Sequence, residues 1–498
     1  MMLDRSSRLA ALAPWLLSAL VAALYLPVIV HGGFLWCDDY TFAQNRLMRD
    51  QAGLARIWSG GDTEQYYPIT YSAYWLVARL FGSGAFAPHV LSVALHVVNG
   101  VLLWMVLRRL GLGAAAFGAL LFALHPIQVE SVAWIYELKN VLSTSLLLLT
   151  ALLHLRYLRD GRALSLALTL ATFTLALLAK SAVLVYPALA LLLLRRHDRP
   201  HMLRSLVPLG LLSVAMAALT VWYERHQTGA QGGEWPQGLA ERTAIAGQTF
   251  WFYLGKMLWP QPLSFAYPRF AIDVLRFAAF APAVLAVLCV GTCLVVRRAR
   301  GLAMLLLAYT ILVFPVLGFF NIYMMRYTFV ADHLAYLPSM LVLPAAAGAL
   351  ARVHRWLPVP VVVIMAALTA ARTPLFERDQ RLWQQALAVD DQAWLAHAGL
   401  ARCLQESGDV EAAFPHYQRA IEIHPRALDV RHLLCVGARQ RGPSRGGAAA
   451  VPPPARDRSA RRARAAQPRQ PDRLARALKL AINPSAGIPP SAAPPAHT

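Results

Sequence analysis

The chain has 498 residues, of which 57% are hydrophobic and 15% charged, and its formal net charge is +21. A soluble globular domain carries about a quarter charged residues. The composition therefore excludes an ordinary soluble enzyme and predicts a chain that meets lipid along most of its length. The positive charge lies mainly in arginines between apolar segments and in the last seventy residues. We therefore expect no nucleic-acid partner.

Apolar segments long enough to cross the hydrocarbon core recur between Leu9 and Ala371. They predict an all-α polytopic membrane domain over residues 1–371 with about eleven spans. The predicted spans are 9–30, 86–107, 111–124, 140–158, 163–179, 181–194, 204–222, 276–296, 301–320, 334–351 and 356–371. Segments 111–124 and 181–194 are short for a span, so the number is accurate to one or two.

The loops between these segments alternate in charge. Every second connection is rich in arginine, sixteen in all, beginning with Arg5 and Arg8 and ending with Arg352 and Arg355. The other connections carry the acids. The positive-inside rule therefore predicts a cytoplasmic N-terminus and acids on the outer face. With an odd number of spans, everything after Arg372 also lies outside.

Residues 376–434 follow a 34-residue period typical of tetratricopeptide repeats. Trp383 and Ala386 lie 34 residues before Tyr417 and Ala420. The remaining landmarks in register are Leu400, Ala401, Leu404, Gly408, Ala413 and Pro425. We expect one and a half to two helical repeats. Residues 435–498 are rich in Pro, Ala and Arg without aliphatic periodicity, and this composition predicts a disordered tail.

Two adjacent acids, Asp38 and Asp39, follow the first span. Ionised side chains beside hydrocarbon are costly and are usually functional. A carboxylate pair at the mouth of a span could supply a general base, or it could be a solvated loop that carries acids by chance. The aromatic stretch 66–75 that follows predicts a helix lying in the plane of the membrane interface, where simple packing is the favoured interpretation.

Other outer loops hold further candidates, each with a structural alternative. His125 and Glu130 could bind a metal or assist a base, but their spacing favours loop architecture. Lys180, at the end of a span, could snorkel or neutralise a lipid phosphate. Arg326 could grip a phosphate with two hydrogen bonds, or it could pair with Asp332.

Several motifs occur together in a fixed order, at residues 36–40, 67–70, 124–134, 137–143, 179–181, 253–260 and 326–333. With Trp383 and the repeats, they resemble bacterial relatives of the transmembrane-and-tetratricopeptide-repeat O-mannosyltransferases. These are membrane glycosyltransferases of the GT-C superfamily. The resemblance spans residues 1 to about 434. It departs from the family in the truncated repeat array and in Ser181, where a proline is expected.

The resemblance implies a GT-C fold and transfer of a sugar from a polyprenyl-phosphate donor to a hydroxyl group, as in protein O-mannosylation. Asp38 or Asp39 would deprotonate the acceptor while its neighbour orients the acceptor or raises the base's pKa. A cation would stabilise the departing phosphate. Arg326 is the first candidate for that role, followed by Lys180, Lys256 and His333. Inversion at the anomeric carbon is expected, with no tightly bound cofactor or metal.

The predicted function is therefore a multi-pass glycosyltransferase of the bacterial inner membrane, with periplasmic repeats that hold a protein or glycan acceptor. One alternative is a catalytically inactive, membrane-anchored repeat scaffold for envelope complexes. A transporter is disfavoured because the predicted spans are nearly free of charge.

Overall fold

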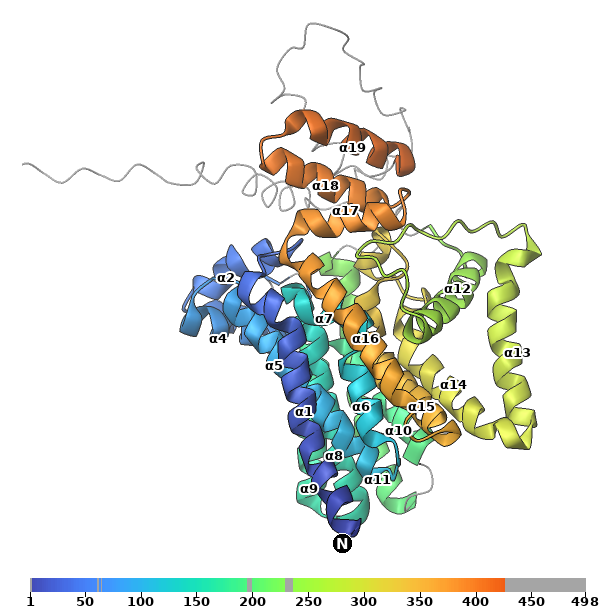
Figure 1. Cartoon of the computed structure of the whole chain (residues 1–498). Helices are drawn as coiled ribbons and strands as arrows, with labels where there is room; N and C mark the ends of the chain where they lie inside the picture. The colour runs from blue at the N-terminus through green and yellow to red at the C-terminus, as the bar shows by residue number, and fades with distance from the viewer. Residues whose placement is uncertain (1, 61, 64, 195–198, 229–235, 426–498) are drawn as a thin grey trace, which may run out of the picture. The chain divides into compact units, whose positions relative to one another are not determined.

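The computed structural model describes residues 2–60, 62–63, 65–194, 199–228 and 236–425 (Figure 1). These residues form helices and loops without a strand, which confirms the all-α prediction. The longer helices are α1 Met2–His31, α4 Pro68–Phe81, α5 Phe86–Arg109, α6 Ala115–Ala123, α8 Leu138–Asp160, α9 Ala163–Ala179, α10 Tyr186–Leu194, α11 Arg199–Tyr223, α12 Leu239–Leu258, α13 Ala281–Val295, α14 Arg300–Val313, α15 Tyr336–Val353, α16 Pro358–Arg372, α17 Asp379–Val389, α18 Trp394–Glu406 and α19 Val410–Ile423. Short helices α2 Arg46–Arg49, α3 Gly53–Ser59 and α7 Val129–Ala133 lie in the loops.

Eight described helical segments are long and apolar enough to span a membrane. A ninth is counted if α6 and the following segment Pro126–Ala133, bent by 48°, are taken as one span. Pro126 explains the bend, because proline cannot continue a helix that would need its N–H. The predicted spans 163–179 and 181–194 are helical and apolar but shorter than eighteen residues. They account for the difference from the predicted number of eleven.

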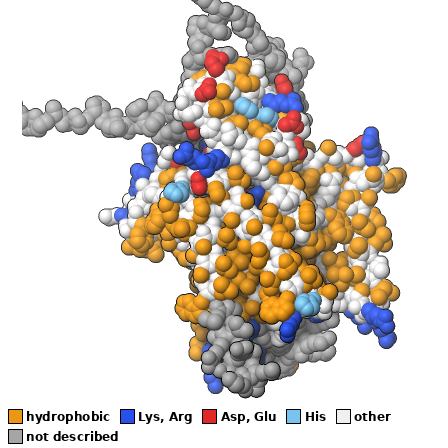
Figure 2. All heavy atoms as spheres, viewed as in Figure 1, with side chains coloured by type: hydrophobic (Ala, Val, Ile, Leu, Met, Phe, Trp, Pro, Cys, Tyr) orange, Lys and Arg blue, Asp and Glu red, His pale blue; other side chains and the backbone are white. Residues whose placement is uncertain are grey.

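The core of the bundle lies around α8, where 67% of the most apolar window is buried. By contrast, no residue of the segment Phe277–Val295 is buried, and α13 stands at the edge of the bundle in Figure 1. Figure 2 shows hydrophobic side chains over most of the visible face of the bundle, with acidic side chains gathered near the repeat helices. This surface suits a protein surrounded by lipid.

Arginine-rich helix ends lie together, as the charge pattern predicts. Arg159 donates to the Arg109 carbonyl (3.3 Å), and Arg109 donates to the Leu152 carbonyl (3.4 Å). His201 packs edge-on against Tyr157 at the same end. The acidic loops lie at the opposite ends of these helices. The arrangement agrees with alternating loops, while the orientation across the membrane stays a prediction.

Helices α17, α18 and α19 pack in sequence as helical hairpins. Residues predicted from the 34-residue period are buried between them, including Trp383, Ala401 and Tyr417. Gly408 takes φ +90° in the turn between α18 and α19, where an L side chain would be strained. A Cβ at Gly399 would overlap the Trp383 ring. The helices lie where the repeats are predicted, and their assignment as tetratricopeptide repeats stays a prediction.

Aromatic side chains join these C-terminal helices to the membrane bundle. Trp36 packs edge-on against Trp383 (5.8 Å between ring centroids) and stacks on Trp134 (6.0 Å). Tyr327 stacks on Trp394 at 5.8 Å. The loop that follows α1, the loop before α15 and the C-terminal helices therefore share one apolar junction. The end of the predicted repeat segment, 426–434, and the predicted tail, 435–498, lie outside the described residues.

Candidate active site

Seven buried ionisable side chains gather where the bundle meets the C-terminal helices. This ion cluster consists of Glu130, Glu137, Lys139, Lys180, Asp332, His333 and Arg372. They come from α7, the turn before α8, the start of α8, the end of α9, the turn before α15 and the end of α16. Three carboxylates face two lysines and one arginine, so the formal charges of the cluster nearly balance. Burial of so many charges is tolerated only when they are paired.

Glu137 lies at the centre of one half of the cluster. Its carboxylate lies 3.0 Å from the Lys139 ammonium and 3.4 Å from that of Lys180. Asn140 donates to the same carboxylate at 2.7 Å and accepts from Lys180 at 2.5 Å. His333 Nε2 lies 3.8 Å away. One carboxylate therefore holds two lysines and orients an amide and an imidazole.

The other half is built around Arg372. Its guanidinium donates to Asp332 at 2.8 Å and lies 4.0 Å from Glu130. Tyr267 also donates to Asp332 at 2.8 Å. His333 Nδ1 lies 2.5 Å from Glu130 Oε1, whereas Glu130 Oε2 has no hydrogen-bond partner among the described residues. The imidazole of His333 thus joins the two halves through Glu130 and Glu137.

The structure separates the two predicted catalytic acids. Asp38 is fully buried, and its two oxygens accept the N–H groups of Leu35 and Tyr136, both at 2.8 Å. Burial raises the pKa of Asp38 well above its ordinary value, although the two N–H donors oppose that shift. Asp39 begins a short π-helical turn, Asp39–Ala43, and is exposed. Asp38 therefore ties the first outer loop to the turn that carries Glu137, and Asp39 alone of the pair meets solvent.

The four predicted phosphate-binding residues occupy two environments. Lys180 and His333 are in the ion cluster. Arg326 is partly buried, donates to the Tyr323 hydroxyl (3.2 Å) and lies over the Tyr327 ring. Lys256 is half-buried and donates to the Pro262 carbonyl. Burial lowers the pKa of Lys256, while Asp332 opposes the shift.

The alternatives raised for the loop residues can be compared with these contacts. Asp332 pairs with Arg372, a partner that sequence analysis did not consider. His125 Nδ1 accepts the Ile127 N–H (3.2 Å) and caps the turn Pro126–Gln128, in keeping with loop architecture. No group of three or more His, Cys, Asp or Glu side chains among the described residues is placed to hold a metal ion. The expectation that no metal is tightly held stays a prediction.

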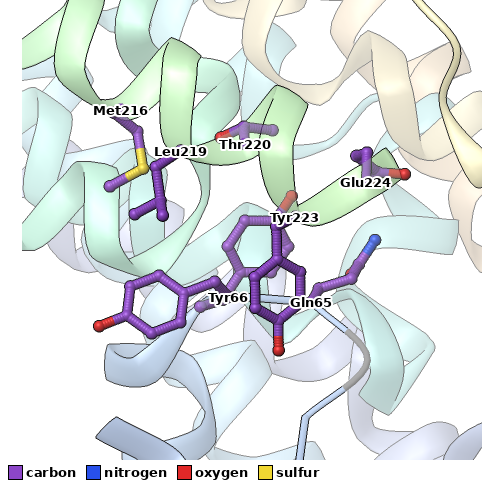
Figure 3. A pocket seen from close by; sticks show the side chains of 8 residues that line it. Gln65, Tyr66, Met216, Leu219, Thr220, Tyr223 and Glu224 are labelled. Carbon is purple, nitrogen blue, oxygen red and sulfur yellow. The ribbon is translucent and has the colours of Figure 1, made fainter. Parts of the chain in front are cut away.

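A narrow pocket adjoins the ion cluster. It has a volume of only about 10 Å³ and lies between the end of α11 and the loop before α4. Figure 3 shows Gln65 and Tyr66 from the loop before α4, together with Tyr223 at the end of α11 and Glu224 at the start of the π-helical turn Glu224–Thr228. Glu224 accepts the Tyr323 N–H at 3.3 Å. The pocket thus lies next to the turn that carries Arg326.

On its other side the pocket approaches the lysines of the cluster. Tyr67 lines the pocket and is hydrogen-bonded to Ser181, the residue after Lys180. Glu224 also interacts electrostatically with Lys139. Glu224 is the one charged side chain among the residues that line the pocket, so the cations of the ion cluster lie beyond its wall.

Sequence analysis missed several members of the cluster as site residues. Glu137, Lys139 and Asn140 belong to a motif quoted for its resemblance, but they were given no role. Arg372 was treated only as the boundary of the last span. The available signal was physical: charged residues that directly flank apolar segments are costly unless they have partners.

Residues 68–223 match the family model described as dolichyl-phosphate-mannose-protein mannosyltransferase. The matched segment runs from α4 to the end of α11 and supplies Glu130, Glu137, Lys139 and Lys180, whereas the remaining cluster residues come from beyond it. A search of curated protein sequences found no match.

A comparison with solved structures found the crystal structure of ArnT from Cupriavidus metallidurans bound to undecaprenyl phosphate. It is 14% identical, the alignment covers 86% of this chain and 77% of that chain, and the TM-score is 0.35. The family match therefore shows that residues 68–223, which contain four of the seven residues of the ion cluster, are related to this mannosyltransferase family, and for this segment it confirms the resemblance predicted from sequence.

Proposed function

We propose that the chain is a membrane glycosyltransferase that moves a sugar from a polyprenyl-phosphate donor to a hydroxyl group of a protein or glycan. The observation that carries this proposal is the ion cluster. Four of its seven residues belong to the segment that matches the mannosyltransferase family, and it lies near a small polar pocket. A purely structural core would not concentrate seven buried ionisable groups at one end of a bundle.

In the proposed reaction, the acceptor oxygen attacks the anomeric carbon as the bond from that carbon to the phosphate oxygen breaks. The electron pair of the broken bond leaves with the polyprenyl phosphate. The acceptor proton passes to Asp39, which is exposed, while Asp38 fixes the loop through its two backbone N–H bonds. Attack opposite the phosphate gives inversion.

Cations are required on the leaving side, because negative charge grows on the phosphate in the transition state. Arg326 and Lys180 come from loops that flank the pocket on opposite sides. Arg326 can form two parallel hydrogen bonds to a phosphate. Glu137 holds Lys180 in place, and Lys256 and His333 add positive character nearby. A lipid-linked sugar is thus the donor substrate, and the C-terminal helices would hold the acceptor.

Purified protein supplied with a panel of polyprenyl-phosphate sugars would test this proposal, with carrier release followed by mass spectrometry. One donor should be consumed when acceptor is present. Asp39→Asn should lower turnover about 10²- to 10⁴-fold, the usual contribution of a general base, without changing the thermal midpoint. Arg46→Gln, an exposed change in the same loop, is the matched control.

An inert panel, or full activity in Asp39→Asn, would contradict the enzymatic assignment or the role of Asp39, respectively. An inert panel together with a specific envelope partner would favour the scaffold alternative. The aromatic junction between the bundle and the C-terminal helices is the observation that keeps that alternative open, because it would fix a repeat platform equally well. The periplasmic location of that platform is part of the proposal.

A further inference from the structure

A second pocket lies on the first outer loop, away from the ion cluster. It has a volume of about 300 Å³, is open on one side, and lies between the π-helical turn after Asp39, α2 and the end of α4. Phe42, Met48 and Ala78 form apolar walls, and Arg49 and Arg79 supply two exposed guanidinium groups. No carboxylate lines this pocket. The pocket therefore has apolar walls and carries positive charge.

Both arginines are held in place without being neutralised by the pocket. Arg49 donates to the Ala43 carbonyl at 2.8 Å, which orients one edge of its guanidinium. Arg79 lies over the Trp75 ring, with 5.2 Å to the centroid. Arg79 interacts electrostatically with Asp50. The Asp50 carboxylate, however, already accepts hydrogen bonds from Arg56 and from the Ala52 N–H. Two fixed guanidinium groups beside one opening suit a phosphate ester.

The depth of the pocket relative to the membrane follows from its distance in sequence to the nearest span. Gly82 and Ser83 line it, and the span α5 begins only three residues after Ser83, at Phe86. Leu80, Phe81 and Phe86 are exposed around it. Trp58 on α3 and Trp75 on α4 belong to the same loop region, and tryptophan favours the boundary between lipid and water. The apolar side chains would therefore enter lipid while the arginines stay at headgroup level.

We propose that the Arg49–Arg79 pocket binds the phosphate headgroup of an anionic phospholipid and thereby anchors the first outer loop to the membrane surface. The same guanidinium pair would accept a soluble phosphate ester, but exposed apolar side chains at the rim favour the lipid. The inference does not rest on the proposed transferase function, because neither arginine belongs to the ion cluster. It adds a bound lipid that positions the loop carrying Asp38 and Asp39.

The test uses the full chain in phosphatidylcholine nanodiscs that contain a small fraction of photoactivatable phosphatidylglycerol, with the reactive group near the headgroup. After illumination, mass spectrometry should locate crosslinks in 42–49 and 78–83. Arg49→Gln/Arg79→Gln should reduce them about 25-fold, from about 1 kcal/mol per arginine at a membrane surface. Arg297→Gln/Arg298→Gln, another exposed pair beside a span, should leave them unchanged.

Two further experiments determine whether the bound phosphate group belongs to a lipid or to a soluble ligand. A photoactivatable phosphatidylcholine should crosslink these segments far less, and equal crosslinking would overturn headgroup recognition. Inorganic phosphate at millimolar concentration should not compete, and strong competition would overturn the lipid assignment in favour of a soluble ligand. Persistence of the crosslinks in the double variant, with its thermal midpoint preserved, would overturn the pocket itself.

Discussion

Two buried polar regions of the bundle differ in chemistry although they share a segment of chain. The polar network consists of His96, Asn99, Ser145 and Tyr336. Asn99 donates to the Val141 carbonyl and to the Tyr336 hydroxyl, each at 2.9 Å, and accepts from Ser145 at 2.6 Å. His96 Nδ1 lies 2.7 Å from the Tyr336 hydroxyl. The network joins α5, α8 and α15 through saturated hydrogen bonds.

The ion cluster lies close to this network in the sequence, because its member His333 is three residues before Tyr336. It is built differently. Its members come from helix ends and breaks and carry charge, and Glu130 Oε2, 4.0 Å from the Arg372 guanidinium, has no hydrogen-bond partner among the described residues. A saturated network of this kind stabilises helix packing. A charged group that can still accept a hydrogen bond, at the end of the bundle, suits chemistry on a charged substrate. The polar network therefore suits helix packing, and the ion cluster is the region to which the proposed reaction belongs.

The largest expected effect follows from removing the charge at the centre of the ion cluster. Glu137→Gln leaves Lys139 and Lys180 without their shared carboxylate, and breaking a buried pair costs about 3–5 kcal/mol. We expect a lower thermal midpoint in detergent and loss of transfer. The double variant Glu137→Gln/Lys180→Met should regain part of the midpoint. A single variant as stable as the parent would show that the cluster is not energetically coupled.

The next largest effect concerns the junction with the C-terminal helices. Trp383→Ala removes a fully buried ring that contacts Trp36 and Phe265. Such a truncation costs about 3–5 kcal/mol locally. Hydrogen exchange should increase in 379–406 while exchange in the membrane spans remains unchanged. Exposed Trp259, replaced by Ala, is the control. Unchanged exchange in 379–406 would show that other contacts suffice to dock these helices.

Arg326 provides a smaller and more specific effect. Arg326→Gln removes the positive charge while leaving a side chain that can still contact Tyr323. Loss of a charge-assisted hydrogen bond to phosphate costs about 1.5–3 kcal/mol. We therefore expect a 10- to 100-fold loss in kcat/KM for the lipid donor and little change in stability. Equal donor kinetics in the variant and the parent would remove Arg326 from the phosphate site and direct attention to Lys180 and Lys256.

Sequence reasoning predicted the helical class, most span positions and the buried face of the C-terminal helices, because each depends on local apolar periodicity. It placed His125, Glu130, Lys180 and His333 at the right end of the bundle. It could not foresee that Asp332 pairs with Arg372, forty residues on, because this contact depends on how α15 and α16 pack. It also could not distinguish Asp38 from Asp39. Their difference arises from the Tyr136 N–H, which only the folded chain brings to Asp38.

The smallest expected effect tests the other side of the comparison. Asn99→Leu removes the amide of the polar network, but the groups that lose it retain other partners: Ser145 still donates to the Val141 carbonyl and the Tyr336 hydroxyl still contacts His96. Hydrogen bonds between membrane helices contribute about 0.6 kcal/mol on average and about 1.7 at most. We expect a slightly lower thermal midpoint and unchanged kcat and KM. A large loss of turnover at unchanged stability would instead mean that the polar network controls the ion cluster through the short segment between His333 and Tyr336, and packing and reaction would then be one system.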